Sequence, residues 1–128
     1  MLTARPKRAA RLTRNSKLFK TIISAIRQKK GENIVSLDLR KIHEAVADFF
    51  IVCEASSSVQ VRAIAEAVEA EVKKITGELP YHHEGYQALQ WVLIDYVNIV
   101  VHIFQPETRK FYKLEEMWND GDHVQHEG

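Results

Sequence analysis

Apolar residues recur with helical spacing in three parts of this chain. The first predicted helix lies between Ser16, a candidate N-cap, and Gly31, a candidate stop. The second begins at Ser57, which forms the spacing of a capping box with Gln60, and ends at Gly77. The third follows Pro106, and its apolar residues at helical spacing are Phe111, Leu114 and Trp118.

Strand patterns lie between these helices. Residues 34–39 alternate between apolar and polar, as in a half-buried strand, whereas residues 49–53 are apolar on both faces and favour a central strand. Residues 90–96 and 98–104 are close enough to form a hairpin, and residues 78–88 before them read as a loop. The order predicts a single α/β domain with a mixed four- to five-stranded sheet flanked by helices.

Charge divides the chain by position. The first thirty residues hold ten of the eighteen basic residues and no acid, and the rest holds eight basic residues and all seventeen acids. The formal net charge of +1 thus joins a segment of +10 to a body of −9. We expect a basic, mobile arm over residues 1–15, a folded domain over 16–118 and a polar, frayed tail over 119–128. Removal of residues 1–14 should then barely change stability.

Composition restricts the cellular setting. The single cysteine, Cys53, lies in an apolar run and cannot form an intrachain disulfide, which favours a reducing, cytoplasmic compartment. No stretch approaches the roughly 20 apolar residues that span a bilayer, so no membrane role is expected. An acid-free, Arg-rich beginning is also typical of organellar transit peptides, but here it runs directly into the first predicted helix.

Candidate catalytic chemistry is sparse. His82, His83 and Glu84 adjoin in a loop and His102 lies on a strand, but no HExxH or paired CxxC motif accompanies them. The thiolate of Cys53 would be disfavoured by desolvation. The phosphate-binding motifs GxxxxGK[ST] and GxGxxG are absent from the sequence, and the carboxylates Asp38, Asp48 and Asp95 are isolated. We therefore predict no catalytic residues, no metal and no cofactor.

Six sequence blocks occur in order along the chain: residues 47–53, 56–57 with 60–65, 84–85, 91–96, 100–104 and 109–118. Taken together, these blocks are similar to the ribosomal silencing factor family, also called Iojap-related proteins. The resemblance runs from about Leu18 to Trp118. Two residues depart from the expected pattern: Ala55 stands where a glycine is expected before the serines, and Val97 where one is expected in the hairpin turn. A β-branched residue resists positive φ, so the type of that turn is open.

The resemblance implies a fold like that of nucleotidyltransferases without their chemistry. It further implies a non-enzymatic repressor that binds the large ribosomal subunit through its fourteenth protein. There it would block joining with the small subunit when nutrients are limiting. The acidic body would suit a basic ribosomal protein, because opposite fields speed encounter.

Carried over by position, the resemblance implies partner contacts by three aromatic and three polar residues. Trp91 and Tyr96 would face opposite sides of an unbroken strand, so a core role for one of them stays open. An alternative function is an RNA-binding module that contacts ribosomal RNA through the basic arm. Apolar patterning on both sheet faces also leaves room for a homodimer. The implied contact residues are Trp91, Tyr96, Tyr112, Asp95, Arg109 and Lys113.

Overall fold

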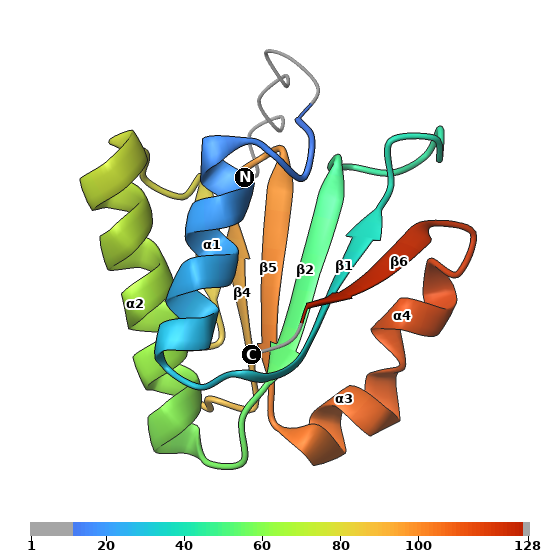
Figure 1. Ribbon diagram of the computed structural model, residues 1–128. Coiled ribbons are helices and arrows are strands. Elements are labelled where there is room, and N and C mark those ends of the chain that lie inside the picture. The colour runs from blue at the N-terminus through green and yellow to red at the C-terminus, as the bar shows by residue number, and fades with distance from the viewer. Residues whose placement is uncertain (1–11, 127–128) are drawn as a thin grey trace, which may run out of the picture.

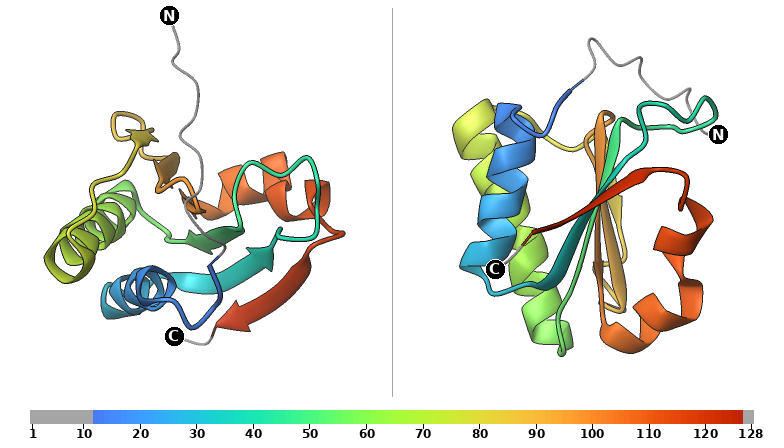
Figure 2. Two further views of the ribbon diagram at one scale, coloured as in Figure 1. Left: turned by 90° about the horizontal axis from the view of Figure 1, so that it is seen from above. Right: turned by 45° about the vertical axis from the view of Figure 1, so that its right-hand side comes forward.

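The computed structural model describes residues 12–126 as one α/β domain of three layers. The helices are α1 (Lys17–Gln28), α2 (Ser58–Thr76), α3 (Pro106–Tyr112) and α4 (Leu114–Met117). The strands are β1 (Glu32–Asp38), β2 (Phe49–Glu54), β3 (His82–Glu84), β4 (Trp91–Asp95), β5 (Ile99–Phe104) and β6 (Asp122–His126). Figure 2 shows the sheet nearly edge-on, with α1 and α2 on one side and α3 and α4 on the other.

The mixed sheet has the strand order β3-β4-β5-β2-β1-β6. Strands β2 and β5 pair in parallel, and the other neighbours pair antiparallel. The predicted hairpin is confirmed as β4 and β5. Strand β2 is central, and Phe49 to Cys53 on it are buried on both faces, as its unbroken apolar run predicted.

Two cores lie on the two faces of the sheet. The larger core packs α1 and α2 against the sheet and includes Phe19, Phe49 and Ile64. The smaller core lies on the opposite face, where Phe50, Phe104 and Leu114 are buried and Trp91 and Trp118 pack against them. We call these the α1–α2 face and the α3–α4 face. Because α3 and α4 are short, the second face is the less completely covered one (Figure 1).

The sheet has more strands than the four or five predicted. Strand β3 lies in the segment assigned to a loop, and β6 lies in the tail expected to fray. Strand β6 pairs with β1 from Ile34 opposite His126 to Asp38 opposite Asp122. Both added strands are edge strands composed mainly of polar residues, so neither carries the apolar alternation that marks a half-buried strand.

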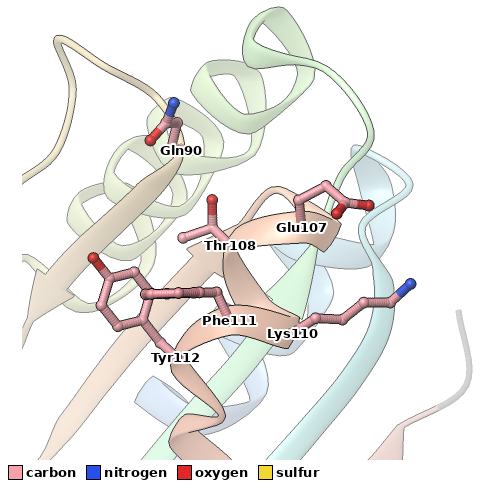
Figure 3. A pocket seen from close by; sticks show the side chains of 6 residues that line it. All are labelled: Gln90, Glu107, Thr108, Lys110, Phe111 and Tyr112. Atoms are coloured by element: carbon pink, nitrogen blue, oxygen red, sulfur yellow. The ribbon is translucent and has the colours of Figure 1, made fainter.

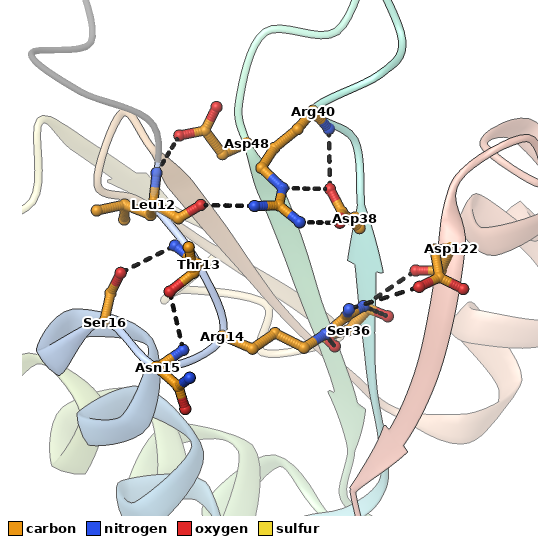
Figure 4. Close-up of polar contacts among 10 residues, drawn as sticks. All are labelled: Leu12, Thr13, Arg14, Asn15, Ser16, Ser36, Asp38, Arg40, Asp48 and Asp122. Atoms are coloured by element: carbon orange, nitrogen blue, oxygen red, sulfur yellow. Dashed lines mark hydrogen bonds and ion pairs between the residues drawn. The ribbon is translucent and has the colours of Figure 1, made fainter.

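The predicted start of the domain also shifts. Leu12 donates its backbone N–H to Asp48 Oδ2 at 3.0 Å, and Arg14 Nε donates to Ser36 Oγ at 2.9 Å. Arg14 also contacts Asp122 on β6 (Figure 4). Residues 12–15, which we assigned to the mobile arm, therefore contact the domain, whereas residues 1–11 lie outside the described part of the chain.

Helix ends follow the predictions in part. The Ser57 hydroxyl accepts from the Gln60 N–H, and Gly77 ends α2 with φ of +78°, both as predicted. The Gln60 side chain, however, donates to the carbonyls of Lys29 and Lys30 rather than completing a capping box. Ser16 is the N-cap residue of α1, but its hydroxyl accepts from the backbone of Thr13. The local pattern thus located the helices better than it located the partners of their caps.

Candidate protein-binding surface

Trp91 begins β4 on the α3–α4 face and is half-buried. Its ring stacks on Phe104 at 4.7 Å between centroids and meets the ring of Tyr112 at 4.9 Å. Its indole Nε1–H donates to Nδ1 of His102 at 3.1 Å. One edge of the ring is therefore fixed by the core, and the other meets a side chain that reaches solvent.

Tyr112 and Phe111 complete an exposed aromatic surface at the end of α3. Tyr112 is 50% exposed and Phe111 is 79% exposed, and their rings meet edge to face at 5.0 Å. They line an open groove of about 590 Å³ together with Gln90, Glu107, Thr108 and Lys110 (Figure 3). We call Trp91, Phe111 and Tyr112 the aromatic surface. Exposed aromatic rings next to polar groups are typical anchors of protein interfaces.

Phe111 corrects the sequence interpretation, which placed it on the apolar stripe of one closing helix. The chain instead breaks at Lys113, which adopts φ of +50° between α3 and α4. The break rotates Leu114 into the core, where it is 8% exposed, while Phe111 stays in solvent. No residue type in this segment signalled the break, since a lysine rarely adopts the left-handed conformation.

Arg109, a predicted contact residue, is largely buried, with only 11% of its side chain exposed. Its guanidinium pairs with both carboxylate oxygens of Glu115 and, at 3.0 Å, with Glu54. It also donates to the carbonyl of Asn33. Burial opposes the charge, but the two glutamates outweigh it and raise the pKa of Arg109 above its usual range. Arg109 therefore joins α3 to α4 and to the sheet, whereas the predicted contact Lys113 is exposed.

Tyr96 and Asp95 are not on this surface. Tyr96 is 4% exposed and belongs to the core on the α1–α2 face, so it is not the exposed contact that the resemblance implied. Asp95 is 6% exposed, and its Oδ1 accepts the N–H of Val97 in the hairpin turn. Because side chains alternate along a strand, Trp91 faces the α3–α4 side of the sheet, whereas Tyr96 faces the α1–α2 side.

Val97 itself adopts φ of +73°, the conformation that its β-branched side chain resists. The Asn98 N–H donates to the Tyr96 carbonyl across it, and the Tyr96 N–H donates to the Ile99 carbonyl. The turn is therefore a tight one whose central residue would suit glycine.

The residues considered for catalysis are dispersed. His82 pairs with Glu84, His83 contacts Glu69, and His102 is buried on β5. Among residues 12–126, no three His, Cys, Asp or Glu side chains converge in a way that would hold a metal ion. Burial raises the pKa of Cys53 to about 12, as for a packing thiol. Within the same residues no helix is long and apolar enough to cross a membrane.

Comparison with known proteins identifies relatives along nearly the whole chain. The family model described as "Ribosomal silencing factor during starvation" matches residues 13–128. The ribosomal silencing factor RsfS of Halalkalibacterium halodurans is 38% identical over 117 residues, which are 89% of this chain and 96% of the relative. RsfS of Bacillus subtilis is 35% identical over 103 residues, covering 80% and 86% of the two chains.

Two further matches concern the fold and the large ribosomal subunit. A crystal structure of a Chromobacterium violaceum protein matches with a TM-score of 0.76 and 30% identity, covering 88% of this chain and 92% of the other. A mouse protein named "Mitochondrial assembly of ribosomal large subunit protein 1" is 26% identical over 99 residues, which are 76% of this chain and 43% of the mouse protein. This chain therefore shares its fold with a solved structure over most of the length of both chains.

Proposed function

This chain belongs to the ribosomal silencing factor family, and from that premise we propose that its aromatic surface docks on the fourteenth protein of the large ribosomal subunit. Bound there, the domain blocks joining with the small subunit and represses translation when nutrients are limiting. It acts in the cytoplasm by binding alone, without catalysis. The name of the mouse relative supports the large subunit as the target.

The observation that carries this proposal is the exposure of Phe111 and Tyr112 beside a held Trp91. Free rings in such positions lose apolar hydration when a partner covers them, and Trp and Tyr are the residues most enriched among interface hot spots. Lys110 lines the same groove and Lys113, which follows Tyr112, is exposed, and both supply polar contacts at the rim. Arg109, buried in ion pairs, positions the surface rather than contacting the partner.

Charge supports the same choice of partner at longer range. The part of the chain after residue 30 carries eight basic residues against seventeen acids. Its net negative field favours encounter with a basic ribosomal protein and disfavours encounter with other acidic proteins. RNA contact by the arm and assembly into a homodimer stay predictions, since the arm's residues 1–11 lie outside the described chain and the structure is that of one copy.

The test is sedimentation of the purified protein with separated large subunits, separated small subunits and joined ribosomes. We expect co-sedimentation with large subunits only, and a fall in the yield of joined ribosomes when the protein is added before the small subunit. Equal binding to joined ribosomes would contradict a steric block. Binding to large subunits lacking their fourteenth protein would contradict the proposed docking partner.

A further inference from the structure

A second surface feature lies on the α1–α2 face, remote from the aromatic surface. A groove of about 280 Å³ runs between α1 and the end of β6. Arg14 and His126 border it from the domain's start and from β6, and Phe19 contributes to its apolar floor. The remaining polar residues that line it are Lys20, Ser24 and Arg27, all on α1 and all exposed.

The groove is strongly cationic. Lys20 and Arg27 lie seven residues apart, two turns of helix, so they project along the same side of α1, with Ser24 between them. No carboxylate is among the described residues that line the groove, and α1 itself contains no acid. Within residues 12–126 neither Lys20 nor Arg27 forms an ion pair. No ion pair with the described residues 12–126 therefore neutralises their charges.

The third cation, Arg14, is held in place. Its guanidinium donates to Ser36 Oγ and to the Asp122 carbonyl, and its Nη1 lies 3.6 Å from the Asp122 carboxylate (Figure 4). His126 accompanies it through a contact of 2.8 Å between its Nε2 and the same Ser36 hydroxyl. These bonds join the segment that precedes α1 to β1 and β6 around one end of the groove. The site is thus assembled by the fold and not by a single flexible side chain.

The titration of His126 reports the same local field. Its pKa is lowered, mainly by burial and further by the positive charges of Arg14 and Arg27. An anion placed between these cations would offset their effect on the imidazole. His126 is therefore a built-in probe of the occupancy of the groove.

We propose that this groove binds the phosphate groups of an RNA strand. Two exposed cations along a helix side match a chain of successive phosphates better than a single small anion, which would need donors converging on one point. Four further basic residues, Arg5, Lys7, Arg8 and Arg11, are joined covalently to this region just before Leu12 and extend the cationic character in sequence. That this RNA belongs to the large ribosomal subunit rests on the proposed function.

The test uses the full-length chain and a short fluorescein-labelled single-stranded RNA, with anisotropy measured over a series of salt concentrations. The double substitution Lys20→Gln with Arg27→Gln should reduce the slope of log affinity against log salt by about 1.4, since each contact to a single strand contributes about 0.7. The matched control is Lys73→Gln with Lys74→Gln, which removes the same charge from the exposed last turn of α2. Its slope should stay close to that of the wild type.

Equal reductions of the salt slope in the two double variants would overturn the proposal, because they would show that net charge alone attracts the RNA. NMR titration of His126 locates the RNA: its pKa should rise when RNA is bound, and an unchanged pKa with bound RNA would place the contact outside the groove. The same rise with inorganic phosphate alone, at equal phosphate concentration, would overturn RNA as the ligand. Tyr112→Ala should bind free RNA normally, so failure of the protein-docking proposal would not alter this test.

Discussion

Trp91 and His102 are joined by a hydrogen bond of 3.1 Å that runs from the indole Nε1–H to the imidazole Nδ1. Because Nδ1 accepts, the imidazole is neutral and carries its proton on Nε2. Burial lowers the pKa of His102 to about 3, against a partial opposing effect of Asp95. A neutral histidine inside the sheet therefore fixes the orientation of the tryptophan that supports the aromatic surface.

The buried, neutral imidazole of His102 predicts that stability depends on pH. The unfolded histidine binds a proton near pH 6.5, whereas the folded one does so only near pH 3, so the unfolded state holds more protons in this window. Stability should fall as the pH drops from about 6.5, by up to about 1.4 kcal/mol per pH unit for one histidine. Urea unfolding at a series of pH values measures it.

The control is His102→Gln, which cannot titrate. Its stability should depend less on pH over the same window, although His126, whose pKa is also lowered, retains part of the effect. An identical pH dependence in the variant and the wild type would exclude His102 as its source.

Arg109 predicts a large structural effect from a residue first assigned to the interface. Its side chain is 11% exposed and pairs with Glu54 and Glu115. Arg109→Ala should reduce the free energy of unfolding by about 3 kcal/mol, because two partly buried carboxylates lose their partner. The stability of Arg109→Lys should lie between those of the wild type and Arg109→Ala, since lysine keeps the charge but cannot form the paired hydrogen bonds.

The matched control for Arg109 is Lys110→Ala, an exposed charge on the same helix, which should change stability by less than about 0.5 kcal/mol. Thermal and urea unfolding give both values. Similar small changes at the two positions would mean that the ion pairs of Arg109 contribute little to the position of α3.

Val97 predicts a stabilising substitution. Its φ of +73° strains a β-branched residue by about 1–2 kcal/mol, and glycine adopts this conformation freely. After the greater entropy of glycine in the unfolded chain is subtracted, Val97→Gly should stabilise the domain by about 1 kcal/mol. Val97→Ala retains most of the backbone strain, so a gain in that variant equal to the gain with glycine would contradict the explanation.

Sequence patterns predicted the interior of this fold better than its edges. The caps at Ser57 and Gly77 and the buried run Phe49 to Cys53 act over a few residues, and the structure confirms them. Strands β3 and β6 depend instead on pairing with β4 and β1, which lie elsewhere in the chain. The backbone groups of these two strands form hydrogen bonds with the neighbouring strand, although their exposed, polar side chains provide no apolar face.

The candidate surface was predictable to a similar extent. The resemblance identified Trp91 and Tyr112, which the structure places in contact. It could not separate them from Tyr96, because a contiguous motif on a strand includes residues of both faces. Phe111 was placed on the apolar stripe of a single closing helix because helical spacing was extended through Lys113, whose left-handed conformation has no local signal. His102 was considered only among the candidate catalytic residues, and its role beside Trp91 depends on the register of β4 and β5.

The start of the domain gives a further prediction. Asp48 is buried and accepts from the backbone of Leu12, and Arg14 contacts Ser36 and Asp122. Deleting residues 1–14 removes these contacts, whereas deleting residues 1–11 retains them. The longer deletion should therefore be less stable than the shorter one by about 1–3 kcal/mol. Equal urea midpoints would restore the original expectation that residues 12–14 contribute nothing to stability.

The central claim is that the aromatic surface docks on the large subunit, and the affinity of Tyr112→Ala for isolated large subunits tests it most directly. Tyr81→Ala, also an exposed tyrosine at 41%, is the matched control. The account predicts a loss of about 2 kcal/mol, roughly thirtyfold, for Tyr112→Ala, with the urea midpoint nearly unchanged and with the control binding as the wild type does. Wild-type affinity in a fully folded Tyr112→Ala protein would contradict it.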